Sequence, residues 1–210
     1  MDILTQKKCQ NLADNIADMV NLSPTVYSAF LGVDRSEFVP IKEYAFELNP
    51  QPLASSQWIS SPLTVAKMTM ALELDGVDKI LEIGCGSGYQ AAILSKIVRR
   101  VFSVERILKL SQDAKKSFEK LNITNIYVRH DDGNYGWKSY APFERILLSA
   151  ATPKINERLF NQLEIGGILV APFVKDGTQF ITKFTKFSDN QIQEELLEKC
   201  DFIPLLDGKE

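Results

Sequence analysis

The feature that most constrains this chain is a glycine-rich turn between an apolar run and an amphipathic stretch. Residues 79–83 are mostly apolar, and they are followed at alternate positions by Gly84, Gly86 and Gly88. Apolar residues at helical spacing come next. Glycines let the backbone turn sharply and approach a ligand closely. The succession of strand, glycine turn and helix therefore predicts an α/β sheet with a site for a nucleotide-like ligand at this turn.

Two acidic residues narrow the choice of ligand. Glu105 ends a second apolar run, where a carboxylate can accept hydrogen bonds from both hydroxyls of a ribose. Glu82 stands just before the turn, and it is a poor neighbour for the pyrophosphate that a G-x-G-x-x-G dinucleotide loop binds. S-Adenosylmethionine suits the pattern better, because it combines an adenosine with a sulfonium and an amino group. The alternatives are a tight turn without a ligand and, for Glu105, a surface acid paired with Arg106 or Arg129.

Composition favours a single globular domain and disfavours several other classes of protein. The 210 residues are 45% hydrophobic and carry a net charge of −3, so there is no basic excess for a nucleic-acid backbone. The three cysteines form no C-x-x-C pair and indicate neither a disulfide framework nor a zinc site. The N-terminus lacks the apolar run of a signal peptide, and no segment reaches transmembrane length. We expect a cytoplasmic protein with no metal, no nucleic-acid partner and no membrane partner.

The first part of the chain is expected to be helical. Apolar residues recur at helical spacing within residues 5–20. Ser23 and Ser61 each precede a proline, and a capping serine followed by a proline is typical of a helix start. Residues 34–59 contain three prolines and are interpreted as a loop-rich connection.

From residue 79 onwards, strand and helix patterns alternate. The expected strands are 79–83, 101–105, 125–129, 144–149 and 167–173, and helices are expected after the glycine turn, at 107–121 and at 155–163. Such alternation predicts a parallel sheet with helical crossovers. Beyond Gly177, a strand-like stretch at 180–185 and an apolar piece at 200–206 have no helix between them, which suggests an antiparallel pair.

The predicted fold class is therefore α/β. It comprises a doubly wound, mainly parallel, seven-stranded sheet with an antiparallel C-terminal finish and a helical N-terminal extension. We expect residues 1–78 to form the extension and residues 79–210 to form the core, as one continuous domain.

Seven segments of the chain, in order, resemble those of one known family. They are Gln57-Trp58-Ile59-Ser60-Ser61-Pro62, the stretch from Leu81 to Gln90, Ser103-Val104-Glu105-Arg106, His130-Asp131-Asp132-Gly133, Ala150-Ala151-Thr152-Pro153, the stretch from Gly166 to Pro172, and Phe202-Ile203-Pro204-Leu205. The glycine turn occurs in many methyltransferases, whereas the first and last segments are more specific. Together they resemble the protein-L-isoaspartate (D-aspartate) O-methyltransferases over about three quarters of the chain.

The resemblance implies a class I methyltransferase-like fold, S-adenosylmethionine as the methyl donor, and the α-carboxylate of isoaspartyl residues in damaged proteins as the acceptor. It implies that Ser60 lies at the acceptor carboxylate, within an acceptor segment that the N-terminal extension carries. The implied cofactor-binding residues are Glu82, Gly84, Gly86, Gly88, Glu105 and Asp132. We expect the protein to act as a monomer on isoaspartyl-containing proteins and peptides.

Three positions depart from the family pattern. Trp58 replaces a threonine beside the active serine, Asp131 replaces a glycine near the adenine side, and Phe173 follows a strand end where a small-residue turn is common. Trp58 is interpreted either as core or as a wall of the acceptor pocket. Two alternatives to the implied activity follow from these departures: a methyltransferase with another acceptor, or a cofactor-binding module that has lost methyl transfer.

The implied chemistry requires few catalytic groups. A carboxylate acceptor is already ionised near neutral pH, because its reference pKa is about 4, so no general base is needed. The enzyme must instead orient the acceptor and exclude water. Ser60 is the candidate orienting donor, whereas Ser61, directly before a proline, is the better helix cap. We assign no catalytic role to His130 and interpret Cys85 as a small residue that fits the turn.

Overall fold

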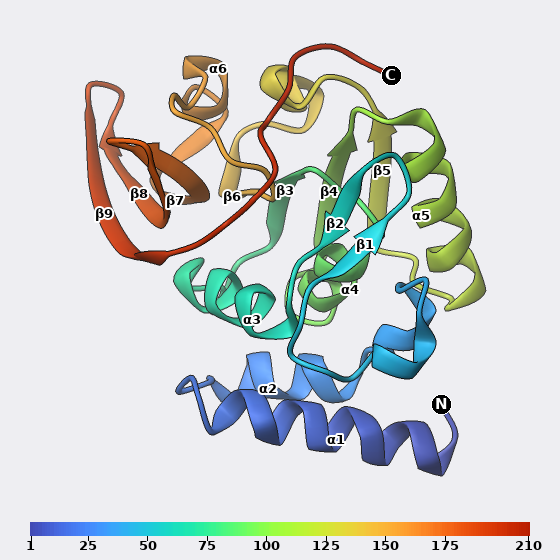
Figure 1. The fold of residues 1–210 in the computed structure, drawn as a ribbon. Helices are drawn as coiled ribbons and strands as arrows, with labels where there is room; N and C mark the ends of the chain where they lie inside the picture. The colour runs from blue at the N-terminus through green and yellow to red at the C-terminus, as the bar shows by residue number, and fades with distance from the viewer.

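The computed structural model describes all 210 residues. Its centre is a sheet that helices cover (Figure 1). The sheet has seven strands in the order β5-β4-β3-β6-β7-β8-β9. The strands are β3 (Lys79–Ile83), β4 (Arg100–Glu105), β5 (Ile126–His130), β6 (Phe143–Leu148), β7 (Leu163–Lys175), β8 (Thr178–Ser188) and β9 (Gln191–Lys199). Strands β3 to β7 pair in parallel, and β8 and β9 add antiparallel. The predicted fold class is thus confirmed.

The chain forms six α-helices. They are α1 (Ile3–Ala17), α2 (Pro24–Leu31), α3 (Pro62–Ala71), α4 (Tyr89–Ser95), α5 (Leu108–Lys120) and the short α6 (Glu157–Phe160). The side chains of Ser23 and Ser61 accept hydrogen bonds from backbone N–H groups in the first turns of α2 and α3. Both predicted helix starts are therefore confirmed, and each has the physical cause that the sequence suggested.

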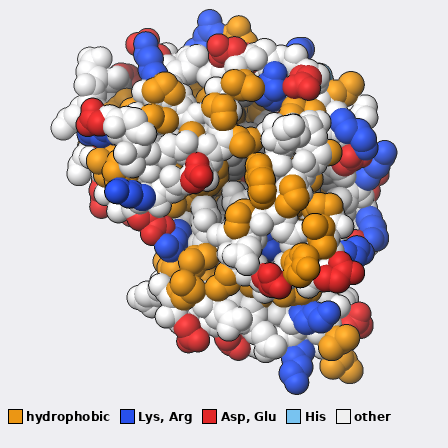
Figure 2. All heavy atoms as spheres, in the orientation of Figure 1, with side chains coloured by type: hydrophobic (Ala, Val, Ile, Leu, Met, Phe, Trp, Pro, Cys, Tyr) orange, Lys and Arg blue, Asp and Glu red, His pale blue; other side chains and the backbone are white.

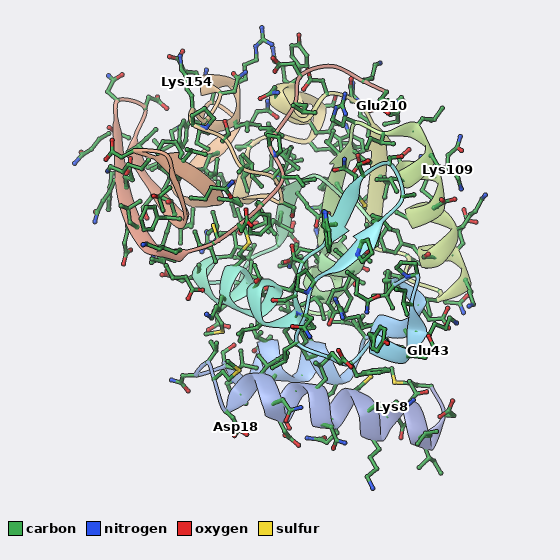
Figure 3. The ribbon with its side chains drawn as sticks, viewed as in Figure 1. Lys8, Asp18, Glu43, Lys109, Lys154 and Glu210 are labelled. Carbon is green, nitrogen blue, oxygen red and sulfur yellow. The ribbon has the colours of Figure 1, made fainter.

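Alternate residues of the strands divide the core into two layers. Ile80 of β3 packs with the buried faces of α1 to α5, whereas Leu81 and Ile83 pack on the opposite face with α6. This alternation is the two-residue period of a strand covered on both sides. Charged side chains such as Lys8 on α1 and Lys109 on α5 point outward from the helices (Figure 3). Residues 1–78 and 79–210 both contribute to the larger hydrophobic layer.

The expectation for the last strand was wrong. The strand that pairs with β8 is β9, at residues 191–199, and not the apolar piece at 200–206. Nearly all side chains of β9 are exposed, because it is the edge strand, and its charged sequence hides the alternating pattern on which prediction relies. Residues 200–206 instead cross the molecule as an extended strap, with one bridge between Ala151 and Pro204.

Residues 34–59 are more ordered than their prolines suggested. They contain two short 3₁₀ turns, η1 (Arg35–Glu37) and η2 (Lys42–Tyr44), and a small hairpin of β1 (Gln51–Leu53) and β2 (Gln57–Ile59). The hairpin lies in front of the main sheet, over β4 and β5 (Figure 1). Two further 3₁₀ turns, η3 (Gly133–Tyr135) and η4 (Lys138–Tyr140), follow β5.

Candidate active site

The candidate site is a cleft at the carboxyl end of β3. Strand β3 lies between β4 and β6, so the strand order reverses at this point, and ligands of open α/β sheets bind where it does. The cleft, including its open mouth, has a volume of about 910 Å³. It is walled by the glycine turn, the end of β4, the β1–β2 hairpin and the strap. Figure 2 shows hydrophobic side chains gathered on the face that the hairpin covers.

The glycine turn is fixed by hydrogen bonds to the end of β4. The N–H of Gly84 donates to the carbonyl of Val104 at 2.8 Å, and the N–H of Gly86 donates to Oε2 of Glu105, also at 2.8 Å. Gly88 has a φ of +90°, and a Cβ there would lie only 2.5 Å from Cζ of Phe118. Only glycine fits at this position, so helix α4 can begin close against α5.

Glu105 faces the cleft from the end of β4. Its Oε2 accepts the hydrogen bond from Gly86, and its Oε1 accepts one from the N–H of Ile107 at 2.9 Å. The residue is only 4% exposed. The two backbone donors hold its carboxylate in one place. Each oxygen can accept a further hydrogen bond, which is the requirement for binding a pair of ribose hydroxyls.

Glu82 does not line the cleft. Its side chain is fully buried, and Oε2 accepts a hydrogen bond from the hydroxyl of Ser103, whereas Oε1 has no partner. Burial raises the pKa of Glu82 to about 8. The hydrogen bond from Ser103 lowers this pKa, and the nearby charge of Glu105 raises it. A direct contact between Glu82 and a cofactor therefore stays a prediction.

Asp132 also lies outside the lining of the cleft, although Gly133 next to it belongs to the lining. Its Oδ1 accepts from the N–H of Asn134 and its Oδ2 from the N–H of Gly208, both at 2.8 Å. The carboxylate thus ties the chain beyond the strap to the turn after β5. Asp131, which replaces the glycine of the family pattern, forms ion pairs with Arg129 and Lys209.

Ser60 lies in the cleft directly after the last paired residue of β2. Its hydroxyl makes no hydrogen bond within the protein, so it is free to donate to an acceptor. Oγ of Ser61, by contrast, accepts from the N–H of Thr64 at 3.0 Å and caps α3. The two adjacent serines therefore differ as the sequence suggested, in that Ser61 is the cap.

Trp58 lines the cleft beside Ser60, and 54% of its surface is exposed. The interpretation of Trp58 as a core residue is wrong, because a core tryptophan would be buried. It forms part of the rim of the cleft, within reach of whatever acceptor enters.

The opposite wall is the strap, which sequence analysis mistook for a strand. Phe202, Ile203 and Leu205 face the cleft, and the strap is held by backbone hydrogen bonds with Ala151 at 2.7 and 2.8 Å. The apolar residues of the strap do not alternate with polar residues and are interrupted by Pro204. This pattern was the sequence signal for a cleft wall. Two further residues were not predicted from the sequence: Tyr89, which begins α4 and lines the cleft, and Arg35, which lies beneath the hairpin.

The cleft holds no activated nucleophile and no cluster of metal ligands. His130 is not in the lining, and its ring contacts backbone carbonyls, including that of Arg106 at 3.0 Å. Cys85 lines the cleft, but burial and the charge of Glu82 raise the pKa of its thiol well above the usual value. No group of three or more potential metal ligands occurs in the structure. The arrangement suits a reaction that requires binding and orientation and no protein nucleophile.

Comparison with known proteins agrees with this chemistry. A family model described as "Protein-L-isoaspartate(D-aspartate) O-methyltransferase" matches residues 6–210. A protein-L-isoaspartate O-methyltransferase of Helicobacter pylori (strain G27) is 48% identical over 199 residues, which cover 94% of this chain and 95% of the relative. One from Maricaulis maris (strain MCS10) is 41% identical, covering 88% of this chain and 87% of the relative.

Solved structures show the same fold. A protein-L-isoaspartate O-methyltransferase structure matches with a TM-score of 0.86 and 27% identity, covering 93% of this chain and 65% of the solved chain. A second, from Plasmodium falciparum and in complex with S-adenosyl-L-homocysteine, matches with a TM-score of 0.84 and 22% identity over 94% and 97% of the two chains. This chain belongs to the protein-L-isoaspartate (D-aspartate) O-methyltransferase family.

Proposed function

We propose that this protein transfers a methyl group from S-adenosylmethionine to the α-carboxylate of L-isoaspartyl residues in damaged proteins, the first step of their repair. Family membership over nearly the whole chain supports the activity. The observation that carries the assignment of residues is the unengaged hydroxyl of Ser60, which lies in the same cleft as Glu105 and the glycine turn.

The residues of the cleft fit S-adenosylmethionine. Gly84 and Gly86 present backbone rather than side chain to the cleft, and Glu105 is held with acceptor capacity to spare for the ribose hydroxyls. Negative charge at Glu105 favours a cationic ligand, and the apolar walls suit an adenine ring. When bound, S-adenosylmethionine supplies an electrophilic methyl group on its sulfonium.

The protein's own part in the reaction is orientation and exclusion of water. An isoaspartyl carboxylate enters ionised, so no protein group needs to remove a proton from it. The Ser60 hydroxyl donates a hydrogen bond that fixes one carboxylate oxygen and leaves the other to react. The hairpin and the strap cover the cleft from two sides, so bulk water is displaced when a peptide binds.

The proposal includes the location, the oligomeric state and the partners of the protein. We assign it to the cytoplasm, acting as a monomer on isoaspartyl proteins and peptides and not on nucleic acids. None of the helices combines the length and the apolar character that a membrane crossing requires. On the face shown in Figure 2, Lys and Arg side chains are interspersed with Asp and Glu, without the basic stripe that a nucleic acid would need.

The test is methyl transfer to a pair of peptides that differ only in an isoaspartyl or an aspartyl residue. We expect transfer to the isoaspartyl peptide alone. Ser60→Ala should lower kcat by about 100-fold, the usual scale for loss of an orienting contact, with cofactor affinity unchanged. Ser61→Ala is the matched control: it should cost about 1 kcal/mol of stability through loss of the helix cap and keep its activity.

Two results would contradict the proposal. If neither peptide is methylated while a small carboxylic acid is, the acceptor is wrong. If Ser61→Ala abolishes transfer and Ser60→Ala does not, the roles of the two serines are reversed.

A further inference from the structure

Arg35 is the only arginine whose side chain is fully buried, and it has no acidic partner. It begins the 3₁₀ turn η1, is 0% exposed and takes part in no ion pair. Its Nε has no hydrogen-bond partner. Removing a guanidinium from water without a counter-ion is unfavourable, so the position calls for a role that an apolar residue could not fulfil.

The guanidinium donates to three backbone carbonyls around the hairpin. Nη1 donates to Ala45 at 2.8 Å, and Nη2 donates to Ser60 at 3.2 Å and, more weakly, to Asn49 at 3.4 Å. Ala45 and Asn49 precede β1, and Ser60 follows β2. Arg35 therefore holds both ends of the hairpin at its base.

The carbonyl of Ser60 has no other partner in the local structure. The β1–β2 ladder ends at Ile59, so Ser60 is beyond its last pair. Helix α3 begins at Pro62, and a proline has no N–H to donate. Without Arg35, the carbonyl of the acceptor serine would have no partner between the end of the ladder at Ile59 and the cap at Ser61.

The same guanidinium lies over the aromatic ring of Tyr89. Its central carbon is 5.3 Å from the ring centroid, within the range of a cation–π contact. Tyr89 directly follows Gly88 of the glycine turn and lines the cleft. Arg35 thus donates to carbonyls that flank the acceptor hairpin and lies over the ring of the first residue of the cofactor helix.

We infer that Arg35 is a positioning residue, which sets the location of Ser60 relative to the glycine turn. The inference rests on the proposed role of Ser60 and adds to it the group that places that serine. It also accounts for the choice of arginine. A planar guanidinium can address carbonyls at its edge and an aromatic ring at its face together, whereas the ammonium of lysine is a compact point charge.

The test compares Arg35→Lys with Arg145→Lys. Arg145 is a matched control, because its guanidinium also donates to backbone carbonyls, those of Leu72, Glu73 and Glu144, but it lies outside the cleft. We expect both variants to fold and both to lose some thermal stability. Arg35→Lys should lower kcat for the isoaspartyl peptide by about 10- to 100-fold, which is the scale expected when a catalytic group is misplaced. Its cofactor affinity should stay within about 3-fold of that of the parent. Arg145→Lys should keep the kcat of the parent.

A second measurement follows the hairpin without using the reaction. The chain has two tryptophans, so in a Trp137→Phe background the fluorescence of Trp58 reports on β2 alone. Arg35→Lys should make Trp58 more accessible to acrylamide and should lower its anisotropy, whereas Arg145→Lys should do neither.

The two measurements separate the possible failures. An Arg35→Lys protein with unchanged kcat and unchanged Trp58 quenching overturns the inference, since Arg35 would then contribute only to stability. If the parent methylates no isoaspartyl peptide, the proposed function fails, and the quenching result still decides whether Arg35 holds the hairpin.

Discussion

The two sides of the cleft are built in different ways. The cofactor side is the end of a parallel sheet: Gly84 and Gly86 donate to the last residues of the adjacent strand, and neighbouring ladders extend this order on both sides. The acceptor side consists of a hairpin of two three-residue strands and an extended strap, with few backbone pairs of their own. The hairpin depends on Arg35, a side chain from a separate segment. Regular structure fixes the first side, and isolated long-range contacts fix the second.

Each side also contains an acidic or basic residue that is 0% exposed and has no counter-ion. Glu82 lies beneath the cofactor side, and Arg35 lies beneath the acceptor side. Burial raises the pKa of Glu82 to about 8, whereas it lowers the pKa of Arg35. Proton binding to Glu82 therefore makes the stability of the cofactor side depend on pH between 4.5 and 8.

The largest effect is expected from Glu82. Its folded pKa of about 8 exceeds the unfolded value of 4.5, so between these values the unfolded chain loses a proton that the folded protein retains. Stability should therefore fall as pH rises through this window, by at most about 1.4 kcal/mol per pH unit for this one group, and level off above it. Glu82→Gln should remove that slope. Denaturant unfolding at several pH values measures it, and parallel curves for the two proteins would show that Glu82 is ionised when folded.

Gly88→Ala tests the close contact that starts the cofactor helix. The new Cβ would lie 2.5 Å from Phe118 at a φ of +90°, so we expect a loss of about 2–4 kcal/mol from overpacking and backbone strain. Gly177→Ala is the matched control, because Gly177 also has a positive φ, +74°, but no atom lies within 4 Å of its added Cβ. It should lose about 1 kcal/mol. Equal losses in the two variants would mean that α4 and α5 can separate freely.

Glu105→Ala tests the cofactor side for binding. We expect affinity for S-adenosylmethionine to fall by about 1–3 kcal/mol, because the ribose hydroxyls and the N–H of Gly86 would lose their acceptor. Calorimetry with S-adenosylmethionine measures the loss, and NAD, which should not bind the parent, serves as the control ligand. Unchanged affinity would remove Glu105 from the ribose site.

The smallest effect is expected on the acceptor side, from Trp58→Thr. Trp58 is exposed, so unfolding stability should change by less than about 0.5 kcal/mol. Peptides with a bulky residue beside the isoaspartyl group should gain about 3- to 10-fold in kcat/KM, on the scale of one aromatic contact, with cofactor affinity unchanged. A peptide series of increasing bulk measures this gain. A large drop in melting temperature with unaltered peptide kinetics would mean that the rim position has no part in selection.

The sequence alone indicated the parallel sheet, the glycine turn at the end of β3, the acid at the end of β4 and the two serine-capped helix starts. All of these depend on residues close together in the chain, where spacing, glycine and proline act directly on the backbone. The same local logic separated Ser61, the helix cap, from Ser60. It failed for β9, because an exposed edge strand needs no apolar alternation, and for the strap, whose apolar residues face a cleft instead of a core.

Only the tertiary structure decided what holds the acceptor side. A single arginine at the start of a 3₁₀ turn, 25 residues before Ser60, belongs to no sequence pattern that could predict its contact with the carbonyl of that serine. Nor could the sequence decide that Trp58 lies on the rim, or that Gly208 and Asp132 join across 76 positions. Such contacts form when the sheet and its helices bring distant segments together. Their geometry is thus set by packing, whereas the glycine turn is set by the backbone preferences of the residues that form it.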